Sequence, residues 1–237
     1  DLHLSLRRQR QMCIRDSCRR KAPKHPATSS KICVSNHCPM PLAKTEPRAI
    51  WRQGWLWPAL HEPSPNCGPR PPGTAIDLAL VHSISLPPGR FGTDAVRQLF
   101  TNTLDPDAHP YFERLRGLEV SAHFFIRRNG ALWQFVSADE RAWHAGKSRF
   151  QGRDNCNDYA VGIELEGLEG ETFEPPQYRT LAWLCRALQA RYPVRHITGH
   201  EHVAPGRKHD PGAGFSWSRL AHDLADSGLR IETRVQP

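Results

Sequence analysis

The sequence predicts a single α/β domain in which a central mixed β-sheet is flanked by helices. Three observations lead to this class. Residues 76–82 and 159–166 have the length and pattern of buried or half-buried strands. Residues 121–136 have the pattern of two strands joined by a tight turn, and residues 175–188 repeat apolar side chains at helical intervals. Strands mixed with helices, together with one hairpin, are typical of a mixed sheet covered by helices.

Breakers and a cap bound the first strand and the helix after it. The apolar run at residues 76–82 is followed by Pro-Pro-Gly at residues 87–89. These residues end regular structure, because proline lacks an amide hydrogen and glycine is conformationally free. Thr93 is then expected to cap a short helix that runs to about Phe100, since a threonine oxygen accepts a hydrogen bond from a free helix amide.

A β-hairpin is expected in the middle of the chain. Residues 121–127 and 131–136 read as strands, and they flank Asn129-Gly130. Both central residues of the tightest hairpin turn need a positive φ, which asparagine and glycine adopt easily. These two strands should therefore pair in an antiparallel way.

The strand at residues 159–166 alternates between two kinds of side chain. Successive side chains of a strand point to opposite faces of the sheet. One face is apolar and the other is polar or glycine: Val161, Ile163 and Leu165 against Gly162, Glu164 and Glu166. The apolar face is expected to meet the core.

Two helices are predicted in the C-terminal third. Pro175-Pro176 suits the first turn of a helix, where the missing amide hydrogens cost nothing. The apolar positions that follow recur at intervals of three or four: Tyr178, Leu181, Ala182, Cys185 and Leu188. A shorter terminal helix is expected at residues 217–224.

The formal charge of +8 is concentrated at the N-terminal end. Residues 1–39 contain nine Lys or Arg against two acidic residues, a net charge of +7. The remaining residues carry 23 basic against 22 acidic groups and are nearly neutral. A nearly neutral domain has no overall field that attracts a polyanion, so we expect no nucleic-acid partner. Nucleic-acid binding through the basic N-terminal segment is the alternative that charge alone supports.

Cysteine usage and hydropathy favour a cytoplasmic protein. Cys67, Cys156 and Cys185 are the cysteines beyond residue 39, and a secreted domain of this size would more often carry an even, paired set. No stretch approaches the roughly 20 apolar residues of a membrane helix, so no membrane partner is expected. Residues 1–39 also lack the apolar centre of a secretory signal.

The chain is expected to divide into three parts. Residues 1–39 are rich in Arg, Lys, Ser and Pro and show no periodicity, which predicts a basic disordered extension. The string QMCIRDS resembles translated sequencing-adapter sequence, and a natural start is expected at Met40, so we interpret the extension as an artefact of gene prediction. The functional domain is assigned to residues 40–230, and residues 231–237 to a tail.

Histidine and carboxylate residues suggest a metal hydrolase. Such an enzyme needs three protein ligands and one open position at which water is activated. His82 ends a predicted strand, and the Gly- and Pro-rich segment 198–212 contains His200, Lys208 and Asp210. With 13 histidines in the chain, each one taken alone is more often a surface or core residue than a ligand.

Four longer motifs make the chemistry specific. They follow one another along the chain as VHSISLPPGRFG, SAHFFIRRNGALWQFV, RAWHAGKSRFQGRDNCNDYAVGIELEG and TGHEHVAPGRKHDPG. They resemble the successive motifs of the AmpD family of N-acetylmuramoyl-L-alanine amidases, over about residues 45–225. The resemblance implies the fold of amidases and peptidoglycan recognition proteins. It also implies a monomer that uses Zn²⁺ to cut the bond between (1,6-anhydro-)N-acetylmuramic acid and L-alanine in small muropeptides, during cytoplasmic cell-wall recycling.

The resemblance further implies roles for five residues. The family's zinc ligands fall on His82, His200 and Asp210, its catalytic glutamate on Glu164 and its catalytic lysine on Lys208. Two neutral imidazoles and a carboxylate leave zinc with one net positive charge, enough to acidify water and polarise an amide carbonyl. Glu164 would take a proton from the attacking water and deliver it to the leaving amine, and Lys208 would stabilise the oxyanion. By pattern alone, Glu166 on the same strand face is an equal candidate for the base.

Other residues bear on the substrate. Four of them lie in motifs that resemble the family's substrate cleft and are predicted contacts: Trp143, His144, Asn157 and Asp158. An aromatic residue such as Trp143 is as often part of a core. Three residues depart from the family pattern, namely Ser83, Glu119 and Asn155. Many relatives have Asn at position 83, and some have Arg at positions 119 and 155. These departures concern recognition of the stem peptide and leave the catalytic assignment intact.

Two alternative functions stay open from the sequence. Related folds that have lost a ligand act as non-catalytic peptidoglycan-binding modules, but His82, His200 and Asp210 are all present here. An amidase that acts on intact peptidoglycan is the catalytic alternative, and the lack of an apolar signal segment argues against it.

Deleting residues 1–39 is expected to leave zinc content, melting temperature and amidase activity unchanged, because a segment without periodicity makes few native contacts. Metal analysis, thermal unfolding and a muropeptide assay on the full-length and shortened proteins would check this. Loss of zinc or of folding in the shortened protein would show that the domain begins earlier.

Overall fold

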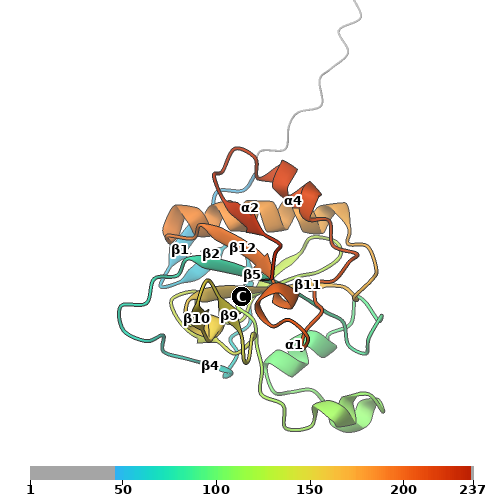
Figure 1. The fold of residues 1–237 in the computed structure, drawn as a ribbon. Helices are drawn as coiled ribbons and strands as arrows, with labels where there is room; N and C mark the ends of the chain where they lie inside the picture. Colours follow the sequence, from blue (N-terminus) through green and yellow to red (C-terminus); the bar gives the residue numbers. More distant parts are fainter. Residues whose placement is uncertain (1–45, 236–237) are drawn as a thin grey trace, which may run out of the picture. The chain divides into compact units, whose positions relative to one another are not determined.

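The computed structural model describes residues 46–235 (Figure 1). The predicted disordered extension, residues 1–39, lies outside the described residues. A seven-stranded sheet runs through the described part in the order β13-β12-β5-β11-β6-β7-β3. In that order the strands are Arg230–Glu232, His196–Gly199, Leu78–Ile84, Ala160–Glu166, Phe124–Ile126, Leu132–Gln134 and Leu60–His61.

The sheet is mixed, as predicted. Its strands from β13 to β6 are all parallel to their neighbours, whereas β6 and β7 pair antiparallel and β3 joins at the edge parallel to β7. The β6–β7 pair is the hairpin predicted around Asn129-Gly130, and Gly130 has the positive φ of 85° that its turn requires.

Shorter elements complete the described part. Two-residue and three-residue strands form small antiparallel pairs, namely β1 (Ile50–Arg52) with β2 (Trp55–Trp57), β4 (Cys67–Gly68) with β8 (Arg141–Ala142), and β9 (Arg149–Phe150) with β10 (Arg153–Asp154). The helices are α1 (Ala95–Phe100), α2 (Pro175–Arg191), α3 (His200–Val203) and α4 (Trp217–Asp223). Turns of 3-10 helix lie at Pro106–Ala108, Phe112–Leu115 and Cys156–Asp158.

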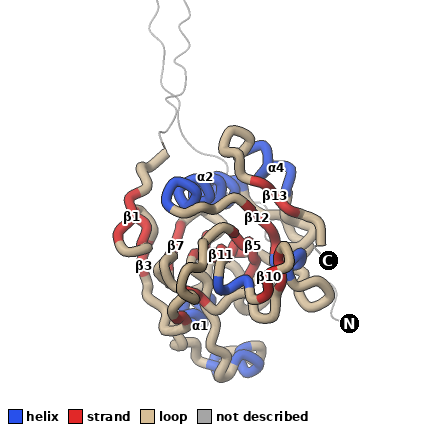
Figure 2. Tube along the Cα trace, turned by 60° about the vertical axis from the view of Figure 1, so that its left-hand side comes forward, coloured by secondary structure: helices blue, strands red, loops and turns tan. Residues whose placement is uncertain are grey.

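Helix α2 covers one face of the sheet, with α4 beside it, and α1 lies on the opposite side of the central strands in both views (Figures 1 and 2). The main core joins α2 to the apolar face of β5 and β11. Its fully buried side chains include Val81, Val161, Ile163, Leu181 and Leu184. The predicted alternation of β11 is therefore confirmed, because Val161, Ile163 and Leu165 pack in this core.

The sequence of α2 explains where the helix begins and why it packs. Pro175 and Pro176 occupy its first turn, and the Gln177 side chain accepts a hydrogen bond from the Glu174 backbone amide at 3.0 Å. All five predicted apolar positions are buried: Tyr178, Leu181, Ala182, Cys185 and Leu188. This amphipathic helix, whose first turn is fixed, thus covers the core with its apolar face.

Several predicted boundaries differ from the structure: the strand predicted at residues 76–82 is β5 at Leu78–Ile84, and the one predicted at residues 131–136 is β7 at Leu132–Gln134. Thr93 does not cap α1, because its hydroxyl donates to the carbonyl of Leu86 at 2.9 Å and Asp94 occupies the cap position. The first hairpin strand begins at Phe124 rather than at residue 121, since the Ser121 amide turns away to bond Trp143. The predicted tail from residue 231 begins inside β13, which pairs with β12 at the sheet edge.

The described residues contain no helix long and apolar enough to cross a membrane.

Replacing Leu181 with alanine should lower the free energy of unfolding by about 2–5 kcal/mol, because the side chain is fully buried between α2 and the sheet and its loss leaves a cavity. Arg179→Ala on the exposed side of the same helix is the control and should change stability by less than about 0.5 kcal/mol. Denaturant unfolding measures both. Equal effects of the two substitutions would contradict this assignment of the core face.

Candidate metal site and cleft

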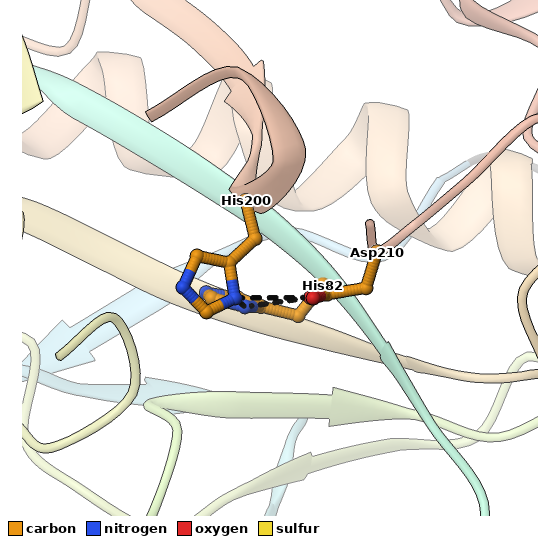
Figure 3. A group of neighbouring side chains, drawn as sticks. All are labelled: His82, His200 and Asp210. Atoms are coloured by element: carbon orange, nitrogen blue, oxygen red, sulfur yellow. Dashed lines mark hydrogen bonds and ion pairs between the residues drawn. The ribbon is translucent and has the colours of Figure 1, made fainter. Parts of the chain in front are cut away.

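Three side chains from distant segments meet at one edge of the sheet (Figure 3). His82 lies near the carboxyl end of β5, and His200 is the first residue of α3, directly after β12. Since β12 and β5 are parallel neighbours, their ends reach the same edge. Asp210 arrives on the loop after α3, which is tied back by a hydrogen bond from the Glu201 amide to the Asp210 carbonyl at 2.9 Å.

The three ligand atoms form a compact triangle. His82 Nδ1 lies 3.0 Å from His200 Nδ1 and 3.1 Å from Asp210 Oδ2, and His200 Nδ1 lies 3.2 Å from the same carboxylate oxygen. All three residues are buried. Ligands of tetrahedral zinc, at about 2.0–2.2 Å from the metal, stand about 3.3 Å apart. The triangle is therefore close to the size that a zinc ion requires.

The far nitrogens of the two rings also favour metal binding. His200 Nε2 lies 2.9 Å from the carbonyl oxygen of Ala145, which can only accept, so this nitrogen carries the ring proton. His82 Nε2 lies 2.9 Å from His144 Nδ1. With the ring protons on Nε2, two Nδ1 lone pairs and the Asp210 oxygen face one another. A bound cation stabilises such an arrangement, so the donor set fits the metal.

The charge states suit the same interpretation. Burial first, and then the neighbouring His200, lower the pKa of His82 to about 4, which keeps its ring neutral at neutral pH. Burial alone would raise the pKa of Asp210, but its hydrogen bonds with His200 and His82 outweigh burial and hold the pKa below its usual value. The site therefore offers neutral imidazole and carboxylate, the ligands that zinc commonly takes.

Glu164 lies beside the triangle. It is paired in register with His82 across β11 and β5, and its Oε2 is buried without a hydrogen-bond partner. Burial, followed by the negative charge of Asp210, raises the pKa of Glu164 well above its usual value, while Lys208 acts in the opposite direction. This carboxyl group is thus free of structural bonds and next to the candidate metal.

Glu166 shares that strand face but is fully engaged. Its Oε1 accepts from the Gly92 amide at 2.5 Å and its Oε2 from the Arg128 amide at 3.0 Å. It is 3% exposed and does not line the cleft. The two glutamates that the sequence pattern left as equals therefore have different surroundings, and Glu166 holds two loops to the end of β11.

The triangle opens into a cleft of about 560 Å³. Glu164 and the exposed Lys208 belong to its lining. The apolar part of its lining includes Leu86, Leu99, Phe100, Tyr111, Leu115 and Leu118. A cleft that combines apolar side chains with convergent polar groups is the usual form of a site for a small molecule.

The predicted substrate contacts divide into two pairs. Trp143 and His144 line the cleft, whereas Asn157 and Asp158 do not. The Asn157 side chain bonds the backbone of residues 144 and 145, and Asp158 bonds Arg141 at 2.8 Å. The structure therefore brings Trp143 and His144 to the candidate site, whereas the other two side chains bond neighbouring protein groups outside the cleft.

The residues that depart from the family pattern also occupy different places. Ser83 lines the cleft beside His82, and its hydroxyl is buried without a partner. Glu119 lines a smaller hollow of about 190 Å³ that shares Leu99, Leu115 and Leu118 with the cleft. Asn155 is exposed and donates to Asp158 at 2.9 Å.

Two contributors to the site were not anticipated from sequence. The Ala145 carbonyl contacts His200 through its backbone, which no side-chain pattern reveals. Gly162 on β11 leaves room for the His144 ring, since a Cβ there would lie 2.5 Å from the ring carbon Cγ. A glycine inside a strand often marks such a close approach, so Gly162 carried a usable signal.

Residues 72–213 match a protein family described as N-acetylmuramoyl-L-alanine amidase. The 1,6-anhydro-N-acetylmuramyl-L-alanine amidase AmpD of Escherichia coli strain K12 is 50% identical over 173 residues, which cover 72% of this chain and 94% of that protein. AmpD of Citrobacter freundii is 50% identical over 170 residues, 71% of this chain and 91% of that protein. The crystal structure of a selenomethionine AmpD derivative superimposes with a TM-score of 0.70 at 47% identity, over 73% of this chain and 98% of that chain.

Proposed function

The chain belongs to the N-acetylmuramoyl-L-alanine amidase family, and we propose that it is a zinc hydrolase that cuts the amide bond between 1,6-anhydro-N-acetylmuramic acid and L-alanine in muropeptides. The observation that carries this proposal is the buried triangle of His82, His200 and Asp210, with the unpaired Glu164 carboxyl group at the same end of an open cleft. The similarity to enzymes named for this substrate supports the choice of bond.

In this proposal His82 Nδ1, His200 Nδ1 and Asp210 Oδ2 hold the metal. Their chemistry suits zinc, because two neutral imidazoles and one carboxylate form a common three-ligand set of zinc hydrolases. Bound zinc supplies Lewis acidity, which lowers the pKa of water and polarises an amide carbonyl.

Glu164 is proposed as the proton carrier. One of its carboxylate oxygens takes a proton from the attacking water and later delivers it to the nitrogen of the leaving L-alanine. Its place next to His82 and the absence of any partner at Oε2 support this role. A carboxyl group whose pKa is raised by burial holds a proton more firmly than an exposed one, which suits the second half of that cycle.

Lys208 is proposed to stabilise the negative charge that develops on the amide oxygen. Its loop follows α3 and leads into Asp210, so the ammonium group and the metal ligand are carried by one short segment. A positive charge placed where an oxyanion forms lowers the energy of the transition state.

The cleft itself is proposed to receive a small soluble substrate. Trp143 and the apolar side chains of the lining offer a surface on which the body of a sugar ring can pack, while the polar groups around the triangle meet the scissile amide. We further propose that the protein acts as a cytoplasmic monomer in cell-wall recycling, in keeping with its similarity to AmpD.

Removing zinc with a chelator should abolish hydrolysis of anhydro-muropeptides, and added zinc should restore it. His82→Ala, His200→Ala and Asp210→Ala should each lower bound zinc and abolish turnover, because two ligands rarely hold zinc in an open site. Metal analysis measures the bound zinc, and a chromatographic assay on anhydro, reducing and polymeric substrates measures turnover. Full activity in the metal-free protein would overturn the mechanism, and a preference for intact peptidoglycan would overturn the substrate.

Glu164→Gln should keep zinc and melting temperature but lower turnover about a hundredfold or more, the usual size of a general acid or base. Lys208→Met should also lower turnover, since it removes the charge opposite the oxyanion. Kinetics, metal content and thermal unfolding of each variant check these expectations.

Glu166→Gln is the matched control for Glu164. It should lower stability by about 1–3 kcal/mol, because one amide donor on Gly92 or Arg128 loses its acceptor, while turnover stays within a few-fold. If Glu166→Gln reduced turnover more than Glu164→Gln does, the assignment of the base would be wrong.

A further inference from the structure

We propose that Asn157 is a positioning residue that fixes the orientation and the proton position of both His82 and His200 through the backbone of residues 144 and 145. This inference rests on the metal site of the proposed function. Asn157 touches neither the candidate metal ligands nor the cleft, so it acts only through the segment that it holds.

One side-chain oxygen of Asn157 holds two consecutive backbone amides. Its Oδ1 accepts from the Ala145 amide at 2.8 Å and from the His144 amide at 3.2 Å. Asn157 is 9% exposed, and its own carbonyl accepts from the partly buried Arg70 side chain at 3.2 Å. Because buried amides need partners, the path of residues 144 and 145 depends on this acceptor.

The position of Ala145 determines the orientation of the His200 ring. The Ala145 carbonyl accepts from His200 Nε2 at 2.9 Å, and Arg207 donates to the same oxygen at 2.7 Å. The carbonyl thereby keeps the His200 proton on Nε2 and leaves Nδ1 free for a metal. If the backbone at Ala145 shifted, His200 Nε2 would lose this acceptor, and the ring proton could move to Nδ1.

The position of His144 determines the orientation of the His82 ring. Its Nδ1 lies 2.9 Å from His82 Nε2, and its ring lies against Gly162, where a Cβ would come within 2.5 Å. His144 Nε2 is buried and has no partner, so the contact with His82 is the hydrogen bond that orients this ring. Metal at His82 Nδ1 requires the proton on His82 Nε2, and His144 Nδ1 is placed to accept it.

Both imidazoles of the triangle are therefore oriented by adjacent residues of one segment, one through a side chain and the other through a carbonyl. A change at His144 disturbs His82 alone, whereas a change at Asn157 disturbs both rings. A substitution at Asn157 should therefore lower metal affinity even though Asn157 does not contact the three ligands.

The test is the zinc dissociation constant of the full chain, measured by competition with a chromophoric chelator. Asn157→Leu keeps the shape but removes the acceptor, and it should weaken zinc binding about 10–100-fold, as the loss of a partner of a metal ligand does. Asn157→Asp keeps an acceptor oxygen and should stay closer to wild type. Gly162→Ala should also weaken zinc binding, because its Cβ displaces the His144 ring.

Gln134→Leu is the matched control. Gln134 is also a buried side-chain amide, but its bonds go to Leu56, Gly54 and Val136, which do not line the cleft. Its loss should lower the melting temperature and leave zinc affinity unchanged. A second measurement, ¹⁵N NMR of the histidine rings in metal-free protein, should show both ligand rings protonated at Nε2 in wild type and a mixture of tautomers in Asn157→Leu.

Two results would overturn the inference: unchanged zinc affinity in Asn157→Leu, or an equal loss of affinity in Gln134→Leu. If Asn157→Leu does not fold, Gly162→Ala tests the inference instead. Unchanged zinc affinity in Gly162→Ala would show that the position of the His144 ring does not orient His82, and it would overturn the inference. Wild-type protein that binds no zinc would instead overturn the proposed function, so the two failures are distinguishable.

Discussion

The parallel register of β12, β5 and β11 is the constraint on which the candidate site depends. Glu164 is paired with His82, and Gly199, which precedes His200, is paired with Val81. Neighbouring strands lie about 4.8 Å apart, so this register sets three polar side chains from distant parts of the chain side by side. A slip of one residue in β5 would turn His82 toward the core under α2 and remove a ligand.

The opposite face of the sheet holds that register in place. Val81, Ile163 and Ile197 pack against α2 in one core, and all three are fully buried. A one-residue slip would turn His82 or Glu164 into this core, where a buried polar group without a hydrogen-bond partner costs roughly 1–3 kcal/mol. The same alternation that builds the core thus determines the position of the polar cluster, and a stable core is a condition for the chemistry.

The sequence predicted the elements well where the signal is local. The Asn129-Gly130 turn, the first turn of α2 at Pro175 and the alternation in β11 all act over a few residues, and each was confirmed. Thr93 failed as a cap because Leu86, brought near by tertiary folding, offers its hydroxyl another partner. Local patterns cannot report such a competitor.

The candidate site was harder to derive from local patterns. The three ligand positions came from a resemblance over long motifs, since a lone histidine among 13 carries little information. The contribution of Asn157 could not be predicted, because it acts through two backbone amides rather than through its own contact with the site. Hydrogen bonds to the main chain leave no periodic trace in a sequence, and only the fold reveals which segment they hold.

Glu164 and Glu166 show what decides the chemistry of a carboxyl group in this fold. They share one strand and one face, and both are nearly inaccessible to water. At Glu166 the loops that carry Gly92 and Arg128 bring two amide donors, which occupy both oxygens. At Glu164 no loop supplies a donor to Oε2, and the neighbouring strand supplies His82 instead. A carboxylate whose two oxygens each accept an amide hydrogen bond is fixed in place and turned away from an attacking water, whereas a carboxylate without such bonds beside a metal ligand remains available to it. The strand only places the two carboxyl groups, and the surrounding loops determine which one is able to move a proton.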